Sequence, residues 1–437
     1  MMLANFSTES LARTASALRS GSWNLLEYLD WLEARFEEWE PAVLAFVPEE
    51  GRFERLRRQA ASLLSAYPEP ENRPLLFGVP VGVKDIFHAK GFETRAGSHL
   101  PPVVLQGPEA DSVTALRQAG ALVLGKTVTT EFAYFAPGPT RNPHHPEHTP
   151  GGSSSGSAAA VGAGLCTLAF GTQTIGSVNR PASFCGVVGY KPSYDRISRA
   201  GVIPLSVSLD HVGLFAPSVS GVDMVAGLLC RYWQLAVMEK RPVLGVPDGP
   251  YLARASEEGL AHFEITCQHL AAAGFEVKRV SAMPDFDAIY ARHNLIVAAE
   301  AAQAHADWFS TYADLYHPKT AELIRRGQQV EAEALTAALA GRVNLRHELL
   351  ALMDKHELDL WISPAAPGPA PKGLDSTGDP VMNLPWTHSG LPTLSLPSGV
   401  NEAGLPLGLQ LTGRWYGDEI VLAWAAEIEP VIRPELM

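Results

Sequence analysis

The hydrophobic positions along the chain recur at two different spacings. Residues 8–40 carry leucines and aromatic residues three and four apart, which predicts two helices separated at Gly21-Ser22. Residues 79–86 and 121–124 are short apolar runs that flank a helical stretch at 112–118. Alternation of strands and helices in this way is typical of a mostly parallel sheet covered by helices.

The second half of the chain continues this alternation. A strand–helix–strand unit is predicted over 242–280, and long amphipathic helices over 285–306 and 320–355. Further apolar, strand-like runs lie at 358–363, 393–396 and 405–411. No stretch between these elements has the composition of a long linker. We therefore predict a single large α/β domain over 1–437, with a mixed, mostly parallel central β-sheet covered by helices on both faces.

Composition and charge narrow the classes of function. The 437 residues are 46% hydrophobic and 19% charged, as in ordinary globular proteins. The formal net charge is −13 without any basic run, which argues against nucleic acid and acidic membranes as partners. No apolar run reaches the roughly 18 residues needed to span a bilayer, and the first residues lack the apolar core of a signal peptide. We expect a cytoplasmic protein with no nucleic acid and no membrane partner.

The segment from Thr149 to Pro192 is rich in glycine and serine. Two apolar runs interrupt it, AAAVGAGL and LAFGT, which predict a buried helix and a buried strand rather than a flexible linker. Glycines between packed elements mark sharp turns or a close approach of the backbone to a ligand. The segment contains neither a GxxxxGK[ST] nor a GxGxxG pattern, so nucleotide binding is disfavoured.

Histidines do not supply an obvious base or metal site. His144, His145 and His148 lie in NPHHPEHTP, where prolines prevent a helix from presenting two of them as a metal-binding pair. We expect a solvated loop there, and no metal. His211 is interpreted as a buried structural residue.

A lysine is the alternative base for a serine nucleophile. Lys84 lies in the apolar run VPVGVKDI, where burial can lower its pKa enough to make it neutral. The pattern alone equally allows a strand lysine paired with Asp85. The turn ending at Ser177, in TQTIGS, offers successive N–H groups that can stabilise an oxyanion.

These residues together resemble the amidase signature family. The resemblance rests on GVPVGVKD around Lys84, on GGSSSGSAAA, and on GTQTIGSVNRPASFCGVVGYKPS. It covers about residues 70–230 and 355–437. It implies a signature core over 70–230, a helical and variable substrate-side region over 231–354, and C-terminal strands and a helix over 355–437 that complete the core.

The resemblance also implies roles for individual residues. The family's Ser–cis-Ser–Lys triad falls on Ser177, Ser153 and Lys84. Ser177 would attack the amide carbonyl, and Ser153 would pass its proton towards Lys84 and later to the leaving nitrogen. Ser154 would help orient the lysine, and no cofactor would be needed. The oxyanion hole would be formed by the backbone N–H groups of Thr174, Ile175, Gly176 and Ser177.

The sequence departs from the family pattern around the nucleophile. Gln173 replaces the family's aspartate, and Asn179 replaces its arginine. Loss of both charges together leaves no unpaired buried charge, so we predict an amide–amide pair that supports the same loop. Ile175 stands where glycine is usual and narrows the floor of the pocket.

The resulting prediction is an amidohydrolase that cleaves the C–N bond of a small carboxamide or ureide and releases ammonia or an amine. The alternatives are the amidase subunit of a tRNA-dependent amidotransferase, an aryl acylamidase, and a non-catalytic scaffold. Tyr134, Trp386 and His388 are predicted to line the substrate pocket, although Trp386 fits a core position equally well. A small-molecule substrate is the expected partner, and a homodimer is left open.

Overall fold

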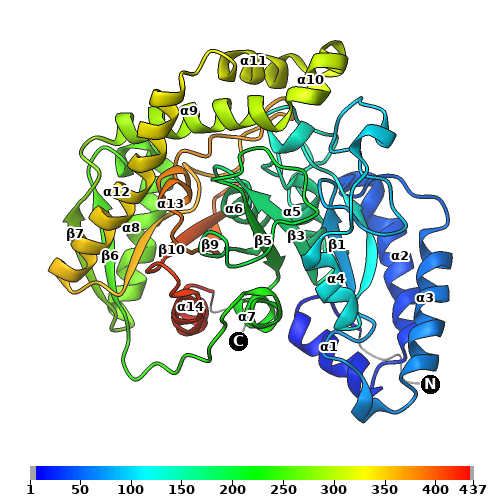
Figure 1. Cartoon of the computed structure of the whole chain (residues 1–437). Coiled ribbons are helices and arrows are strands. Elements are labelled where there is room, and N and C mark those ends of the chain that lie inside the picture. The colour runs from blue at the N-terminus through cyan, green and yellow to red at the C-terminus, as the bar shows by residue number, and fades with distance from the viewer. Residues whose placement is uncertain (1–5, 434–437) are drawn as a thin grey trace.

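The centre of the protein is a ten-stranded mixed sheet in the computed structural model, which describes residues 6–433 (Figure 1). Its strands lie in the order β2-β1-β3-β5-β4-β9-β10-β8-β6-β7. Their bounds are β1 Pro80–Lys84, β2 Leu122–Thr127, β3 Leu168–Gln173, β4 Val188–Lys191, β5 His211–Ala216, β6 Val243–Asp248, β7 Glu276–Ser281, β8 Leu360–Pro364, β9 Thr393–Val400 and β10 Pro406–Thr412.

Strand pairing is parallel at the two ends of the sheet and antiparallel in its middle. The strands β2, β1 and β3 run parallel, as do β8, β6 and β7, whereas the five pairings from β3 to β8 are antiparallel. The predicted mixed sheet is therefore confirmed, but "mostly parallel" describes only its outer parts. The pattern did not reveal β4 and β5. Loops join β4 to β5 and β9 to β10, and antiparallel neighbours need no crossover helix.

Helices cover both faces of the sheet. Helix α5 contacts β1, β2, β3 and β5, helix α6 contacts β4, β9 and β10, and α7 and α14 contact β4, β5, β9 and β10. No helix within residues 6–433 is both long and apolar enough to cross a membrane. The helix bounds are α1 Leu11–Ser20, α2 Leu25–Val43, α3 Arg52–Ala66, α4 Asp111–Gln118, α5 Ser155–Gly162, α6 Asn179–Cys185, α7 Val219–Leu229, α8 Glu257–Ala272, α9 Phe286–Ala304, α10 Ala306–Tyr312, α11 Pro318–Gly327, α12 Ala332–His356, α13 Leu384–Ser389 and α14 Asp418–Ile432.

The helix predicted over 320–355 is two helices, α11 and α12. Helix α11 ends at Gly327, where the backbone packs closely on α9. A Cβ at this glycine would lie 1.9 Å from the Ala298 carbonyl oxygen, so the absence of a side chain allows the contact. Both helices pack against α9, so the apolar spacing continues across the break between them. For this reason the pattern alone predicted one continuous helix.

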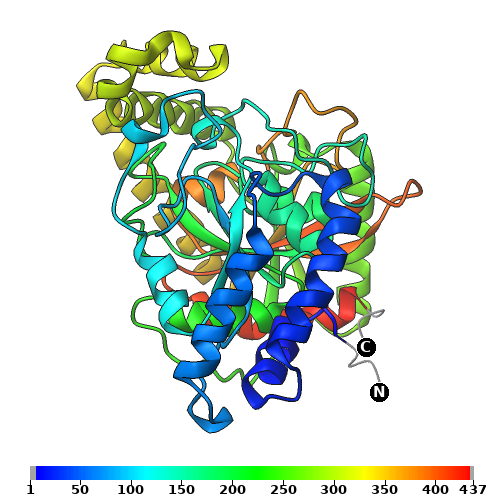
Figure 2. The ribbon, with the colours of Figure 1, turned by 90° about the vertical axis from the view of Figure 1, so that its right-hand side faces the viewer.

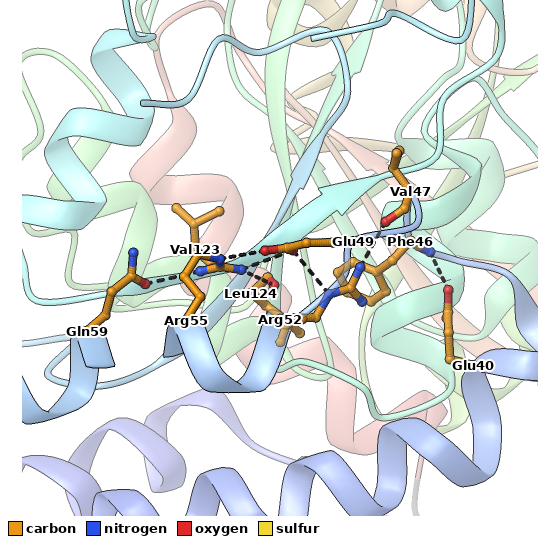
Figure 3. A network of polar contacts seen from close by, with 9 residues as sticks. All are labelled: Glu40, Phe46, Val47, Glu49, Arg52, Arg55, Gln59, Val123 and Leu124. Atoms are coloured by element: carbon orange, nitrogen blue, oxygen red, sulfur yellow. Dashed lines mark hydrogen bonds and ion pairs between the residues drawn. The ribbon is translucent and has the colours of Figure 1, made fainter. Parts of the chain in front are cut away.

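A polar network fastens the N-terminal helices to the edge strand β2 (Figure 3). Arg55 on α3 donates to the carbonyl oxygens of Val123 and Leu124, over 2.9 and 3.0 Å. Glu49 binds Arg55 Nε over 2.6 Å and fixes the guanidinium in that position. The arginine covers carbonyls at the edge of the sheet, which reduces the exposure of that edge to other strands.

Helices α9, α10 and α11 form an arm at the top of the molecule in both views (Figures 1 and 2). The segment between α10 and α11 packs against the residues that precede Tyr134, since the rings of Phe132 and Tyr316 stack with centroids 5.2 Å apart. Glu131 accepts hydrogen bonds from the backbone N–H of His317 on both carboxylate oxygens, each over 3.0 Å. These contacts fix the segment that leads to Tyr134, one of the predicted pocket residues.

Candidate active site

Lys84 is the last residue of β1 and is completely buried. Its Nζ donates hydrogen bonds to Ser153 Oγ and to Thr172 Oγ1, each over 2.7 Å. Thr172 lies on β3, which pairs with β1 in parallel, so two adjacent strands direct these side chains to one point. The structure thus brings together Lys84 and Ser153, which are far apart in the sequence.

Burial also determines the charge of Lys84. Removal of the amine from water lowers its pKa well below the ordinary 10.5, and the carboxylate of Asp210 acts in the opposite direction. Asp85, the partner that the sequence allowed for Lys84, instead forms an ion pair with Lys126 over 2.7 Å. Lys84 therefore has the surroundings of a neutral amine that can accept a proton.

Ser153 lies in a turn that its neighbours hold in place. The Gly152–Ser153 peptide bond is cis. Arg180 donates from a guanidinium nitrogen to the Gly152 carbonyl oxygen over 2.6 Å. Gly151 has a φ of 82°, and a Cβ there would lie 2.8 Å from Pro181 Cα, so this position requires glycine. The glycines before Ser153 thus serve the backbone geometry that presents its hydroxyl.

Ser154 is hydrogen-bonded to strand β3, and among residues 6–433 the hydrogen-bond partners of Lys84 Nζ are Ser153 and Thr172. Its Oγ donates to the carbonyl oxygen of Thr172 and accepts from the N–H of the same residue, each over 3.2 Å. Thr172 Oγ1 binds Lys84, so Ser154 is connected to the lysine through Thr172. The sequence analysis did not identify Thr172 as a partner of Lys84. The feature that could have indicated it is a polar residue at the end of the otherwise apolar run LAFGT.

Ser177 follows β3 and lies two residues before the start of α6. It is 8% exposed and lines a small cavity together with Ser153. Gly176 has no room for a side chain, since a Cβ would lie 2.3 Å from Asn383 Oδ1. Ser177 and Ser153 therefore face one cavity, and Ser153 is in turn bonded to Lys84.

Four backbone donors in the turn before Ser177 are unpaired in the part of the chain that the structure describes. The N–H groups of Thr174, Ile175, Gly176 and Ser177 have no hydrogen-bond partner within residues 6–433. Unpaired N–H groups at a nucleophile suit an oxyanion, whose charge develops only in the transition state. The side chain of Thr174 is bonded separately, since its hydroxyl donates to Asp210 Oδ1 over 2.5 Å.

Gln173 and Asn179 form the predicted amide–amide contact. Gln173 Nε2 donates to Asn179 Oδ1 over 2.9 Å, and Gln173 Oε1 accepts from the backbone N–H groups of Val178 and Asn179. Thr387 extends this network, because it accepts from Gln173 Nε2 over 2.9 Å and donates to the Ile175 carbonyl oxygen over 2.6 Å. Neutral amide and hydroxyl groups thus hold residues 173, 175, 178 and 179 of the turn around Ser177, while Thr174 is held by the carboxylate of Asp210.

The three predicted pocket residues lie in different places. Tyr134 is half-buried and lines the cavity at Ser177. Trp386 is fully buried on α13, where its Nε1 donates to the Tyr251 hydroxyl over 2.8 Å. His388 is also fully buried, and its ring lies 5.4 Å from that of His293. The structure does not place Trp386 or His388 at this cavity, because α13 turns both side chains into the core.

Two histidines of the proline-rich loop anchor it to backbone. His144 Nε2 lies 2.9 Å from the Cys185 carbonyl oxygen, and His148 Nδ1 lies 2.7 Å from that of Ala370. Since a carbonyl oxygen only accepts, these nitrogens donate. The prolines and the two contacts give this loop a fixed path beside the serine-rich segment.

Comparison with known families identifies the class of protein to which this fold belongs. The sequence pattern of the family described as Amidase matches residues 32–422. The chain belongs to the amidase family.

Individual relatives align with most of the chain. A subunit of glutamyl-tRNA(Gln) amidotransferase from Synechococcus sp. (strain WH7803) is 31% identical, with 96% of both chains covered. The corresponding subunit from Koribacter versatilis (strain Ellin345) is 32% identical, with 86% of this chain and 89% of that one covered. A crystal structure described as an amidase superposes with a TM-score of 0.88 at 31% identity, covering 97% of this chain and all of that one. Native peptide amidase from Stenotrophomonas maltophilia gives a TM-score of 0.80 at 25% identity, covering 97% of each chain.

These relatives correct one expectation. The sequence analysis expected no nucleic-acid partner because the chain is acidic and has no basic run. Relatives that match almost the whole chain are named for glutamyl-tRNA, so that expectation is wrong. Net charge describes one chain alone, and one member of a complex can act on a nucleic acid that the other members bind.

Proposed function

We propose that this protein cleaves the C–N bond of an amide through an acyl-enzyme on Ser177. The observation that carries the proposal is the contact of Lys84 with Ser153, whose side chain shares a cavity with Ser177. A serine hydroxyl is a weak nucleophile and needs a base that can take its proton. A buried lysine bonded only to hydroxyls supplies such a base.

The reaction follows from these positions. Ser177 Oγ attacks the amide carbonyl while its proton moves through Ser153 to Lys84. The unpaired N–H groups at 174–177 stabilise the oxyanion, an effect typically worth about 3 kcal/mol for one donor. Lys84 then returns the proton through Ser153 to the leaving nitrogen, which departs as ammonia or an amine. Water attacks the acyl-enzyme by the same route and frees Ser177.

The relatives favour a role within a larger enzyme. We propose that the chain is the amidase subunit of an amidotransferase that uses glutamyl-tRNA, where it releases ammonia from an amide donor. Support comes from the curated relatives, which carry this name and align over 96% of the chain in the first case. In this role other subunits bind the tRNA and receive the ammonia.

The cavity supports a second candidate, an amidase that acts by itself on a small apolar amide. Arg180 is the one charged residue among those lining the cavity, and its guanidinium nitrogens already donate to Gly152, Thr377 and Gly378. A zwitterionic donor such as glutamine needs charged partners for its ammonium and carboxylate groups. The apolar wall residues are Ala133, Tyr134, Phe135, Ile175, Leu205 and Pro380.

Ammonia release from a panel of amides tests the proposal and separates the two candidates. The purified chain is incubated with glutamine, asparagine, aliphatic amides, anilides and ureides, and ammonia and amines are measured. Release from apolar amides by the chain alone favours the second candidate. Release from glutamine only when the other amidotransferase subunits and glutamyl-tRNA are present favours the first.

The variant Ser177→Ala identifies the nucleophile in this assay. We expect turnover to fall by at least about a thousandfold while the far-ultraviolet circular dichroism and melting temperature stay those of the wild type. Ser155→Ala is a matched control, because Ser155 lies in the same segment but donates to the Val128 carbonyl oxygen. Substantial activity in Ser177→Ala would mean that another group attacks the amide.

A further inference from the structure

The cavity that Ser177 and Ser153 share is narrow. Its volume is about 10 Å³, whereas a cavity needs roughly 10–15 Å³ to hold one water molecule. Beside the attacking oxygen there is therefore room for a group of about one non-hydrogen atom. Six apolar residues close this space, namely Ala133, Tyr134, Phe135, Ile175, Leu205 and Pro380. These walls limit the size of the group that lies next to the scissile carbonyl.

Ile175 is a wall residue with little freedom to move. Its side chain is branched at Cβ, which restricts rotation about the first side-chain bond. Its carbonyl oxygen accepts a hydrogen bond from the Thr387 hydroxyl over 2.6 Å. The next residue, Gly176, packs so closely that a Cβ there would lie 2.3 Å from Asn383 Oδ1. The backbone that carries the Ile175 side chain is therefore fixed.

Leu205 is fixed to the same turn through Asp210. The carboxylate accepts from the Leu205 N–H over 2.9 Å and from the Thr174 hydroxyl over 2.5 Å. The wall at Leu205 and the turn that carries Ile175 therefore cannot separate without loss of one of these bonds. Tyr134 and Phe135 have more freedom, because both are half-buried and pack edge to face with ring centroids 4.8 Å apart.

The shape of the tetrahedral intermediate decides which part of the substrate meets this wall. In the proposed reaction its carbon carries Ser177 Oγ, the oxyanion, the leaving nitrogen and the substituent of the acyl group. The oxyanion faces the N–H groups at 174–177. The nitrogen must lie within reach of Ser153, which returns the proton to it. The acyl substituent takes the remaining direction, away from Ser153 and beside the turn that contains Ile175.

Charge in the cavity does not remove this limit on size. Arg180 is the charged residue of the lining, and its Nη1 and Nη2 already donate to neighbouring oxygens. Its Nε has no hydrogen-bond partner within residues 6–433. A carboxylate on the acyl group has three non-hydrogen atoms, which exceeds the space of about 10 Å³. An acyl group with a carboxylate therefore separates the effect of charge from that of size.

We propose that Ile175 determines the specificity for the acyl group and restricts it to the size of formyl or acetyl. The inference rests on the proposed function, in the form of the second candidate, because it concerns the acyl-enzyme on Ser177 and a glutamyl group exceeds the limit. The substrates are then amides of formic or acetic acid whose amine part is not restricted by Ile175. Each methylene added to the acyl group should lower kcat/KM about tenfold or more.

The test compares different acyl groups on one leaving group. The substrates are the 4-nitroanilides of formic, acetic, propionic, butyric and hexanoic acid, with the 4-nitrophenyl esters of acetic and butyric acid as more reactive acyl donors. Release of 4-nitroaniline or 4-nitrophenol gives kcat/KM. The ratio of kcat/KM for butyryl to that for acetyl does not depend on the fraction of folded enzyme. In the wild type we expect a ratio of about 0.01 or less.

Two variants enlarge the space in steps. Ile175→Val removes one methyl group and should raise the butyryl-to-acetyl ratio about threefold, whereas Ile175→Ala should raise it at least about tenfold. Both keep the backbone N–H at this position. Ile197→Ala is the matched control, because Ile197 is 2% exposed and does not line this cavity. It should keep the wild-type ratio. Acetyl amides of aniline, benzylamine and methylamine should keep their wild-type order in all variants, since the amine leaves on the side of Ser153.

The outcomes separate this inference from the proposed function. A low ratio that rises from wild type to Ile175→Val to Ile175→Ala, but not in Ile197→Ala, would establish the role of Ile175. A wild-type ratio near one, or equal ratios in all variants, would overturn that role and leave the proposed function standing. Faster cleavage of the malonyl than of the acetyl 4-nitroanilide would show that Arg180 selects a carboxylate, which also overturns the size limit. Release of neither 4-nitroaniline nor 4-nitrophenol by the wild type would overturn both proposals.

Discussion

Two buried lysines on neighbouring strands have opposite surroundings. Lys84 on β1 and Lys126 on β2 are almost completely shielded from water, with exposed fractions of 0% and 4%. Lys126 is ion-paired with Asp85 over 2.7 Å, whereas Lys84 bonds to the hydroxyls of Ser153 and Thr172. Burial lowers the pKa of both lysines, and a nearby carboxylate opposes this shift in each case. At Lys126 that carboxylate, Asp85, is also a hydrogen-bond partner, whereas at Lys84 the carboxylate of Asp210 is not.

The comparison shows that burial alone does not make a lysine a base. A buried amine with a carboxylate beside it remains a structural cation, since the pair stabilises the charged form. A buried amine among hydroxyls gains little from its charge and is better suited to be neutral. The partner of a lysine, rather than its burial, therefore distinguishes the catalytic candidate from the structural one.

The largest expected effect comes from removal of the amine of Lys84. In Lys84→Met we expect kcat/KM to fall by about three to four orders of magnitude, because Ser177 loses its base. The folded protein should remain, since the Met side chain fills a similar volume without a charge. Steady-state kinetics with a substrate from the amide panel checks the rate, and circular dichroism checks the fold. A rate within tenfold of the wild type would remove Lys84 from the mechanism.

The pH dependence tests the same residue with a defined sign. Neutral Lys84 is the active form, so wild-type activity should rise with pH as the amine loses its proton, at a pH well below 10.5. The residual activity of Lys84→Met should lack that rise. Below pH 10.5 Lys84 is protonated in the unfolded chain, whereas in the folded protein its lowered pKa keeps it neutral. The free energy of unfolding of the wild type should therefore rise with pH between the pKa of the folded state and 10.5. Chemical denaturation at several pH values should show a smaller gain in the variant.

Lys126→Met should lower stability strongly and activity little, the reverse of what we expect for Lys84→Met. It leaves the buried Asp85 carboxylate without its partner, so we expect the free energy of unfolding to fall by about 3–5 kcal/mol. Activity per folded molecule should change much less than in Lys84→Met. Urea denaturation followed by tryptophan fluorescence measures the loss of stability.

A second substitution provides the control for this prediction. Asp85→Asn in the Lys126→Met background removes the unpaired charge, so the double variant should recover part of the lost stability. If Lys126→Met abolished turnover at full stability, the division between a structural and a catalytic lysine would be wrong.

The triad residues were predicted through the resemblance to the amidase signature family, since the local pattern alone left the role of Lys84 open. Lys84 ends an apolar run, and Ser153 and Ser177 follow glycines that allow tight turns. The contact of Gln173 with Asn179 was also predictable, since two linked replacements within six residues indicate a pair. Whether Lys84 binds Asp85 could not be read from the chain, because Lys126 enters from another strand.

Features that depend on tertiary packing were not predictable in the same way. Trp386 and His388 have residue types that suit a pocket, yet helix α13 buries them both. Asp210 is a lone acid in SLDHVG, and only the folded chain brings it to Thr174. Strands β4 and β5 lie within or just after the segment whose glycines and serines dominate the pattern, so their apolar residues did not stand out.

The smallest expected effect extends the comparison to the turn before Ser177, where the hydroxyl of Thr387 binds both Gln173 and the backbone of Ile175. Thr387→Val removes the hydrogen bond to the Ile175 carbonyl oxygen and the acceptor for Gln173 Nε2. We expect kcat to fall about tenfold, equivalent to roughly 1.4 kcal/mol, with little change in KM, because the turn loses alignment with the oxyanion. Thr393→Val is the matched control, since Thr393 donates to Asn179 Oδ1 on the side of the network away from Ile175. Equal losses of kcat in both variants would show that the network acts as one unit, and that Thr387 has no separate role in positioning the turn.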